Sequence, residues 1–563
     1  MTKYLNFMNK VLSIVTILVF VNCNYQEDKS IKAAVVSARI EASNIGIEVI
    51  AKGGNAFDAM IATDLALSVC YPNAGNLAGG GFLVYRTSDG SFGSLDYREK
   101  APSLSSRDMY LDSEGNVIEG ISTLGGLAIG VPGTIAGLFE VHEKFGTLPW
   151  NELIQPAIDL ATNGYVVTKK QSNSFKNKKE EFIKVNGENT FYAKNYDEGD
   201  IIINLPLANT LKLIQQNGKA GFYKGINAQR LTKRVKNAGG IITEEDLKNY
   251  SPVWRDPVQF QYKELTITSM GPPSSGGVCL GQMLQMIEPF DIKKYGHNSV
   301  ESIQLMVEAE RRTYADRSEY LGDPDFVNIP QSELMDSTYL TNRMKSFNWD
   351  NASLSSDINP GKVIINESEE TTHYSIIDKE GNAVSVTTTL NGSYGSKVYV
   401  EDGGYFLNNE MDDFSSKPGV PNMFGLLGSE ANSILPGKRM LSSMTPTIVD
   451  KNKKLYMILG TPGGSTIITS VFQTILNAYE FDMGMQESVN SARFHHQWMP
   501  DVIILEPKQF DSDLISNLNN KGYNIEERLS RIIGRVDAIM IDDNGIITTG
   551  ADPRGDDSSS TLR

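Results

Sequence analysis

Two runs of β-branched residues on either side of a short linker constrain the fold of this chain more than any other feature of its sequence. Residues 371–377 and 383–389 flank five residues that end in Gly-Asn, which is the pattern of a β-hairpin. A type I turn over the linker, with Gly381 in a left-handed conformation, makes the numbers of paired residues sum to 760. This register places Thr371 opposite Thr389.

The two faces of this hairpin differ in chemistry, because residues two apart in a strand point to the same side. From the pattern alone, the polar face is either the solvated side of a half-buried hairpin or a catalytic surface. A threonine hydroxyl is an effective nucleophile only beside a base, and its own α-amine becomes one once the preceding peptide bond is cut. The apolar face carries Tyr374, Ile376, Val384 and Val386, and the polar face carries Thr371, His373, Ser375, Ser385, Thr387 and Thr389.

The first residues of the chain have the pattern of an export signal. Lys3 and Lys10 are the only charges before the apolar run from Val11 to Val21, which is too short to span a bilayer. We expect residues 1–22 to be a signal peptide and the mature protein to be exported, either to a bacterial periplasm or to a membrane of the envelope. Cys23 stands where bacterial lipoproteins carry their lipid-attachment cysteine. The alternative is cleavage nearby by ordinary signal peptidase, with Cys23 incidental.

The charge of the chain excludes some classes of partner. The 563 residues carry a net charge of −16, which becomes −18 once two signal-peptide lysines are removed. Such an acidic protein is not expected to bind nucleic acid, and it would meet an anionic membrane only through a lipid anchor. Besides Cys23, the chain has only Cys70 and Cys279, both in apolar surroundings, so we expect buried free thiols and no disulfide framework.

A strand-to-helix junction near the C-terminus offers a second chemical feature. Residues 455–460 read as a strand and residues 465–479 as a helix, joined by a turn that contains Gly463 and Gly464. Free backbone N–H groups at a helix N-terminus, unobstructed by side chains, suit a developing oxyanion. A G-x-S-x-G elbow is absent, so Ser465 is not the expected nucleophile.

The segment Thr371-Thr372-His373-Tyr374-Ser375, with Asn391 soon after it, resembles the start of the small subunit of γ-glutamyltranspeptidases. The resemblance extends from about Ala33 to the C-terminus. Members of that family are N-terminal-nucleophile hydrolases that cut themselves before this threonine. The resemblance therefore implies an α+β fold, a four-layer αββα sandwich, made of a large subunit (23–370) and a small subunit (371–563). These subunits would form one intertwined domain and pair as a heterodimer.

The activity implied by the resemblance is acyl transfer without a metal or cofactor. Cleavage between Glu370 and Thr371 would free the Thr371 amine. Thr371 would then accept the γ-glutamyl group of glutathione or a related amide and pass it to water, an amino acid or a peptide. Thr389 would orient Thr371, and the backbone of Gly463 and Gly464 would stabilise the oxyanion.

The resemblance also assigns the residues that hold the substrate. A planar guanidinium holds a carboxylate with two parallel hydrogen bonds, and a desolvated cation needs an anionic partner. Two residues depart from the usual family pattern, since many members carry Gln where Glu410 stands and Phe424 of the lid loop replaces a tyrosine. Arg98, Ser442 and Ser443 are expected to bind the substrate carboxylate, and Asn391, Glu410 and Asp413 its α-ammonium.

Two other functions are compatible with parts of this pattern. A related acylase would act on glutaryl-type β-lactam side chains, but a glutaryl group has no ammonium for Asp413 to bind. A non-catalytic surface lipoprotein derived from the enzyme would have no need of Thr371, Thr389 and the glycine pair.

Residues from Pro330 to Glu370 are largely polar, and we expect them to form a flexible tail.

Overall fold

The computed structural model of the chain describes residues 30–359, 371–527 and 532–563. The predicted signal peptide, Cys23 and Glu370 lie outside these residues. Within the described ranges, no helix is both long enough and apolar enough to cross a membrane.

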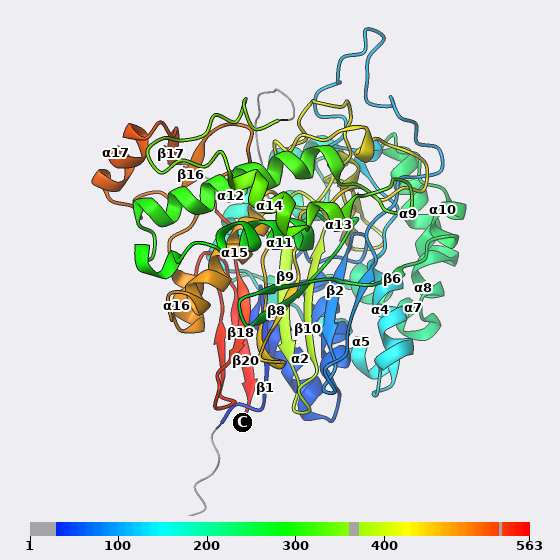
Figure 1. Cartoon of the computed structure of the whole chain (residues 1–563). Helices are drawn as coiled ribbons and strands as arrows, with labels where there is room; N and C mark the ends of the chain where they lie inside the picture. The colour runs from blue at the N-terminus through cyan, green and yellow to red at the C-terminus, as the bar shows by residue number, and fades with distance from the viewer. Residues whose placement is uncertain (1–29, 360–370, 528–531) are drawn as a thin grey trace, which may run out of the picture.

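Two β-sheets pack face to face in the centre of the molecule, and helices cover the outer side of each (Figure 1). The larger sheet has the strand order β20-β1-β9-β10-β2-β3-β6, and the smaller has the order β19-β18-β14-β13-β8-β7. The larger sheet consists of β20 (Ser558–Leu562), β1 (Ala33–Ser37), β9 (Thr372–Ile377), β10 (Ala383–Thr389), β2 (Gly80–Arg86), β3 (Phe92–Asp96) and β6 (Val253–Arg255). The smaller consists of β19 (Ile547–Gly550), β18 (Asp537–Ile541), β14 (Lys454–Gly460), β13 (Thr447–Lys451), β8 (Leu265–Ser269) and β7 (Val258–Tyr262).

The helices form the two outer layers, which confirms the predicted αββα sandwich. Helices α2 and α3 contact the larger sheet, and α11 and α15 contact the smaller one. The helices are α2 (Ile40–Ala51), α3 (Ala56–Cys70), α4 (Thr134–Phe145), α5 (Trp150–Asn163), α6 (Lys169–Asn186), α7 (Leu205–Asn217), α8 (Ala220–Tyr223), α9 (Gly225–Asn237), α10 (Glu244–Lys248), α11 (Gly276–Ile287), α12 (Val300–Tyr320), α13 (Gln331–Leu334), α14 (Ser337–Met344), α15 (Thr466–Tyr479), α16 (Met485–Asn490) and α17 (Ser512–Asn520). Short strands outside the two sheets are β4 (Tyr165–Val166), β5 (Ile201–Ile202), β11 (Tyr399–Val400), β12 (Tyr405–Phe406), β15 (Phe494–His495), β16 (Ile503–Leu505) and β17 (Ile525–Glu527).

Three apolar clusters lie between these layers. One fills the space between the larger sheet and its helices and includes Tyr374 and Val386 of the hairpin. A second fills the corresponding space beside the smaller sheet. A third lies between the sheets, where Val36 and Phe82 meet Ile458. Burial of apolar surface on both sides of each sheet thus holds the four layers together.

The hairpin has the predicted register. Val386 pairs with Tyr374 and Thr388 with Thr372, so that paired numbers sum to 760. Gly381 has φ 87°, which is the left-handed conformation that the turn requires. Turn geometry alone therefore fixes which residues of β9 and β10 face each other.

The polar face of the hairpin is buried against the smaller sheet, so it is not a solvated surface. The Ser375 hydroxyl donates to the Asp537 carbonyl at 3.0 Å, and the Ser385 hydroxyl donates to the Leu459 carbonyl at 3.0 Å. His373 is fully buried, and its ring nitrogens lie 3.0 Å from Thr387 Oγ1 and 3.1 Å from Ser375 Oγ. Burial lowers the pKa of this histidine to about 3, so it is neutral at physiological pH.

The expectation of a flexible tail from Pro330 is wrong for residues 330–359. This stretch contains α13 and α14, and Ser355 is buried where its carbonyl accepts a hydrogen bond from Trp498 Nε1 at 3.0 Å. Polar composition gave the wrong expectation because these side chains have partners far away in the sequence. Residues 360–370 lie outside the described part of the chain.

Asp378 connects the hairpin turn to α3 and provides a test of the fold. Its carboxylate accepts hydrogen bonds from Ala56 N at 2.9 Å and from Asn382 Nδ2 at 2.7 Å, and it is nearly fully buried. Asp378→Ala should lower the free energy of unfolding by about 2–3 kcal/mol, because buried donors lose their acceptor. Urea unfolding followed by tryptophan fluorescence measures this. Asp89→Ala, in an exposed turn, should have a much smaller effect, and equal effects would contradict the prediction.

Candidate active site

Thr371 lies at the end of the central hairpin strand, one residue before β9 begins, and only 4% of its surface is exposed. Continuation of the register places it opposite Thr389. The carbonyl of Thr371 accepts a hydrogen bond from Arg535 Nη2 at 3.3 Å. The nucleophile predicted from the sequence is therefore held from β10 and from the residues that lead into β18.

The glycine turn lies beside Thr371. His373 packs against Gly460, the last residue of β14, and the turn follows directly. Arg535, which contacts Thr371, also donates its backbone N–H to Thr461 Oγ1 at 2.6 Å. Thr371 and the strand-to-helix junction are thus brought together by contacts from both the larger and the smaller sheet.

Gly463 and Gly464 have the geometry expected of oxyanion donors. Their φ angles are 136° and 52°, where a side chain is strained. Neither N–H donates to any group in the described residues, and both precede the N-terminus of α15. Two free donors and a helix N-terminus beside a nucleophile can stabilise the negative charge of a tetrahedral intermediate.

A buried cluster of charges lies on the other side of the hairpin end. Arg98 Nη1 lies 2.5 Å from Glu410 Oε2, and Arg98 Nη2 pairs with Asp413 Oδ2. Glu99 is also buried, with a carboxylate oxygen 3.8 Å from Arg98 Nη1. The structure therefore brings together one guanidinium and three carboxyl groups, of which Arg98, Glu410 and Asp413 were predicted as substrate ligands.

Burial changes the protonation of these carboxyl groups. It raises the pKa of Glu410 to about 8, although the nearby Arg98 guanidinium opposes this rise. Burial and the neighbouring Glu410 raise the pKa of Glu99 well above its usual range. Burial also raises the pKa of Asp413, and the Arg98 guanidinium opposes this rise. A carboxyl group with a pKa near 8 is mainly protonated at pH 7, so Glu410 adds little negative charge beside Arg98 at that pH.

Thr389 and Asn391 lie at the end of β10, next to the charge cluster. The Thr389 hydroxyl accepts a hydrogen bond from Asn391 N at 2.7 Å, and its interaction with the Glu410 carboxyl group lowers the pKa of that group. Asn391 has φ 73° and donates from Nδ2 to the Asn409 carbonyl at 3.1 Å. The described residues contain no hydrogen bond between Thr389 and Thr371, so the orienting role of Thr389 stays a prediction.

The lid residue Phe424 packs directly against the glycine turn. Its ring lies where a side chain on Gly464 would collide with it, and it is almost fully buried. The loop is held by Asn422, which accepts from Phe424 N at 3.0 Å and donates to Asp413 Oδ1 at 3.2 Å. Phe424 thus covers the oxyanion turn by apolar contact, in a position where it has no hydroxyl to donate.

The paired serines lie on the segment that leads into β13, where Ser442 forms a bridge with Ser274 just before α11 and Ser443 contacts α12. Ser442 Oγ accepts from Met444 N at 3.1 Å, and the Ser442 carbonyl accepts from Ser275 Oγ at 2.7 Å. Ser443 Oγ accepts from Arg317 Nη2 at 3.0 Å. Arg98 Nε donates to the carbonyl of Met440 at 3.5 Å, which connects this loop to the charge cluster.

Sequence reasoning missed Arg535, Arg317 and the buried state of Glu99. Arg535 pairs with Tyr71 and lies near Asp537 and Asp557, two carboxyl groups whose pKa values are raised by burial. No local signal marks Arg535 or Arg317, because partners such as Thr371 and Ser443 are more than a hundred positions away. Glu99 stood beside Arg98 in the sequence, where a surface ion pair is the commoner reading.

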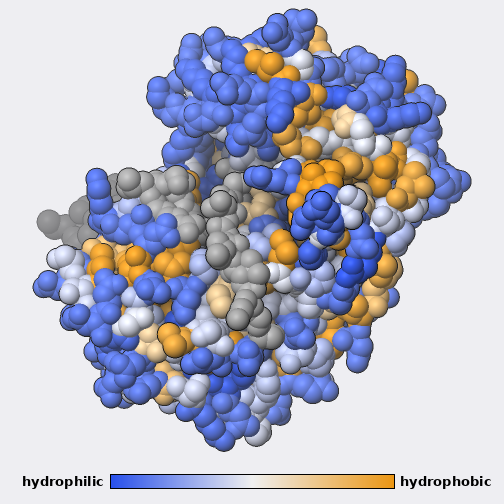
Figure 2. All heavy atoms as spheres, turned by 90° about the horizontal axis from the view of Figure 1, so that it is seen from above, coloured by the Kyte–Doolittle hydropathy of each residue, from blue (hydrophilic) through white to orange (hydrophobic). Residues whose placement is uncertain are grey.

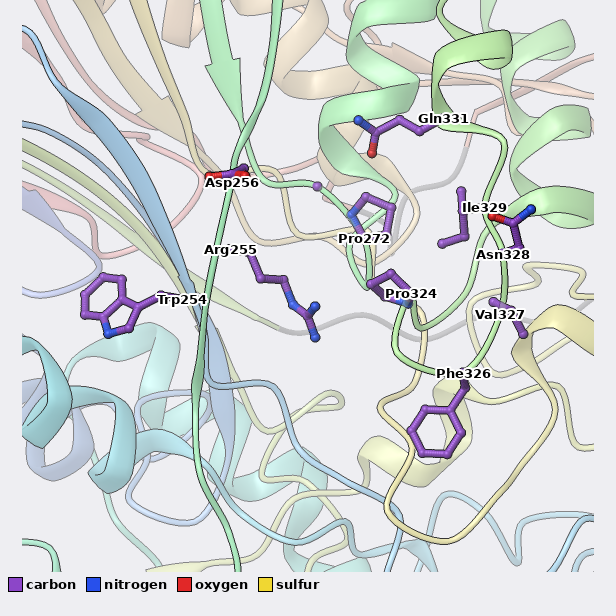
Figure 3. A pocket seen from close by; sticks show the side chains of 11 residues that line it. Trp254, Arg255, Asp256, Pro272, Pro324, Phe326, Val327, Asn328, Ile329 and Gln331 are labelled. Atoms are coloured by element: carbon purple, nitrogen blue, oxygen red, sulfur yellow. The ribbon is translucent and has the colours of Figure 1, made fainter.

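A separate surface hollow of about 650 Å³ lies near Arg255, Pro272 and Phe326 (Figure 3). None of the predicted site residues line it. Arg255 is already paired with Asp96 at 2.8 Å and Asp325 at 2.7 Å.

The face seen from above is largely hydrophilic, with hydrophobic side chains in smaller groups (Figure 2).

Comparison with known proteins agrees with this arrangement. The family model described as gamma-glutamyltranspeptidase matches residues 42–562. The glutathione hydrolase proenzyme of Escherichia coli (strain K12) is 43% identical over 528 residues, which cover 93% of this chain and 90% of that protein. The crystal structure of Helicobacter pylori gamma-glutamyltranspeptidase has a TM-score of 0.56 at 42% identity and covers 58% of this chain and 94% of its own. Cephalosporin acylase from Bacillus halodurans, with a TM-score of 0.84 at 23% identity, shares the fold and covers 96% of this chain and 99% of its own.

The raised pKa of Glu410 predicts a specific pH dependence. Glu410 has a pKa of about 8, so it becomes negatively charged as the pH rises from 7 to 9. The new charge attracts an ammonium group, and wild-type kcat/KM for a substrate that carries one should therefore increase over this range. Glu410→Gln, which keeps the side chain neutral, should match the wild type near pH 6.5 and lack this gain. Profiles of kcat/KM from pH 6 to 9 with a γ-glutamyl anilide measure the difference. Superimposable profiles would contradict it, and Glu430→Gln, at an exposed position, is the control.

Proposed function

Because the chain belongs to the γ-glutamyltranspeptidase family, we propose that it transfers the γ-glutamyl group of glutathione or a related amide to Thr371. From there the group passes to water, as in glutathione hydrolysis, or to an amino acid or peptide. The same proposal includes cleavage of the precursor before Thr371.

The observation that carries this function is the buried pairing of Arg98 with Glu410 and Asp413. An α-amino acid head group carries one negative and one positive charge close together. A guanidinium faces the carboxylate and two carboxyl groups face the ammonium, so both charges find a partner in a site where water is excluded. In the absence of substrate, the three protein groups pair with one another.

The proposed acyl transfer uses the geometry around Thr371. The Thr371 hydroxyl attacks the γ-carbonyl of the substrate, and its α-amine accepts the hydroxyl proton. The carbonyl oxygen becomes negative and is stabilised by the N–H groups of Gly463 and Gly464. Departure of the amine, which receives the proton, leaves a γ-glutamyl ester on Thr371. Water or an acceptor amine then attacks this ester and restores the free hydroxyl.

Self-cleavage would use the same hydroxyl before the amine exists. Attack of Thr371 Oγ on the carbonyl of Glu370 breaks the peptide C–N bond, and the nitrogen takes up the proton. The resulting ester is hydrolysed by water, which releases the chain end at Glu370 and frees Thr371. We propose that the two fragments stay together as a heterodimer, because both sheets contain strands from each side of the cut.

A glutaryl-type β-lactam acylase is the nearest alternative. Its substrate has a carboxylate but no ammonium, so Asp413 would lie buried without a cation from the substrate. The four-layer fold is shared with cephalosporin acylase and does not separate the two activities. The charge cluster favours a γ-glutamyl substrate.

The substrate preference tests the proposed activity directly. We expect the purified protein to release the chromogenic amine from a γ-glutamyl anilide about 100-fold faster than from the glutaryl analogue, because the analogue leaves buried groups unpaired. Initial rates over a range of concentrations give kcat/KM for both. Equal values, or a preference for the glutaryl compound, would favour the acylase, and no release from either would favour the non-catalytic protein.

Substitutions of Thr371 test self-cleavage. Thr371→Ala should give a single full-length chain without transferase activity. Thr371→Ser should still cleave, more slowly, because it keeps the hydroxyl but loses the β-methyl group that restricts its rotamer. A denaturing gel shows the fragments, and Edman sequencing of the smaller wild-type fragment should begin Thr-Thr-His-Tyr-Ser. An uncut chain that turns over the anilide would refute the need for a free α-amine.

A further inference from the structure

Arg317, near the C-terminal end of α12, is a buried cation directly behind the substrate-binding serines. Only 3% of its surface is exposed. Its guanidinium donates from Nη2 to Ser443 Oγ at 3.0 Å and from Nε to Ser275 Oγ at 2.9 Å. Both partners are neutral hydroxyl groups, so neither offsets the positive charge.

No carboxylate in the described part of the chain lies within ion-pair distance of Arg317. The adjacent Asp316 is paired with Arg343 at 2.9 Å, which leaves it no free charge for Arg317. Burial raises the pKa of the nearby Cys279 thiol to about 12, so this group is not an anion either. The guanidinium therefore has no ion pair of its own, and the carboxylate that acts on its charge from a longer range is that of Asp413.

A buried cation without an ion pair is costly, and proteins seldom keep one without a use. Burial lowers the pKa of Arg317 relative to an exposed arginine, but a guanidinium remains protonated under physiological conditions. Arg98 differs, because it pairs directly with Glu410 and Asp413. Without substrate, the site thus has one guanidinium with direct carboxyl partners and one whose direct partners are hydroxyl groups.

The hydrogen bond to Ser443 also sets the direction of the serine hydroxyl. Since Ser443 Oγ accepts from Arg317, its own proton points elsewhere, and in the described residues it donates to no other group. Such a hydroxyl is ready to donate to an anion on the side away from Arg317. The positive charge behind it makes it a stronger donor.

We propose that Arg317 is a positioning residue that makes the site specific for the α-carboxylate of a γ-glutamyl substrate. It orients and polarises Ser443, and its charge is balanced when the carboxylate binds. This inference rests on the proposed function, because it assigns part of the recognition of that same substrate. Arg98 then binds the carboxylate directly, and Arg317 acts on it through Ser443.

Two substrates that differ only in the α-carboxylate test this role. They are γ-glutamyl-4-nitroanilide and 4-aminobutyryl-4-nitroanilide, and the selectivity is the ratio of their kcat/KM values. Arg317→Gln should lower this ratio about 10- to 100-fold, mainly by raising KM for the γ-glutamyl compound, since a hydrogen bond to a charged group is lost. Arg317→Lys keeps the charge but cannot hold both Ser275 and Ser443, so its loss should be smaller.

The outcomes separate the proposal from a purely structural role. A loss confined to the γ-glutamyl substrate, in either variant, supports it, and Arg317→Lys decides alone if Arg317→Gln does not yield cleaved enzyme. An equal loss on both substrates, or no selective loss, overturns it. Arg343→Gln is the matched control, because this neighbouring arginine pairs with Asp316 and should leave the ratio unchanged. A wild-type protein inactive on both substrates would refute the proposed function itself.

Discussion

A row of hydroxyl groups is buried between the two sheets, and two of them form hydrogen bonds with the opposite sheet. The Ser375 and Ser385 hydroxyls donate to carbonyls of β18 and β14, at Asp537 and Leu459. These bonds fix how far one sheet slides over the other, because a shifted arrangement would leave buried polar groups unpaired. The position of Thr371 relative to the turn of Gly463 and Gly464 follows from this alignment.

The hairpin was predictable because its information is local. Five linker residues and alternating side chains determine the register, and Gly381 adopts the conformation that the turn demands. The surroundings of its polar face were not predictable from the pattern, since a row of hydroxyls suits solvent as well as a second sheet. The prediction of a flexible tail for residues 330–359 was wrong for the same reason, because the partners of Ser355 come from distant segments.

In the candidate site too, some residues were predictable from the sequence and others depend on partners far away in the chain. A family resemblance identified Arg98, Glu410, Asp413 and the serine pair, and the structure brings the three charged groups together beside the loop that carries the serines. The resemblance could not show that two of the predicted ammonium ligands, Glu410 and Asp413, pair with Arg98 in the absence of substrate. Nor did any local pattern mark Arg535, whose partners Tyr71 and Thr371 are separated from it by 464 and 164 positions.

The distribution of strands between the sheets has a consequence for the lifetime of a cut protein. Each sheet contains strands that precede Glu370 and strands that follow Thr371, so β9 and β10 lie between β1 and β2 of the other fragment. Separation of the fragments would expose all three apolar clusters and is therefore equivalent to global unfolding. Dilution dissociates most protein complexes by mass action, but it would leave this pair of fragments assembled for as long as the fold itself persists.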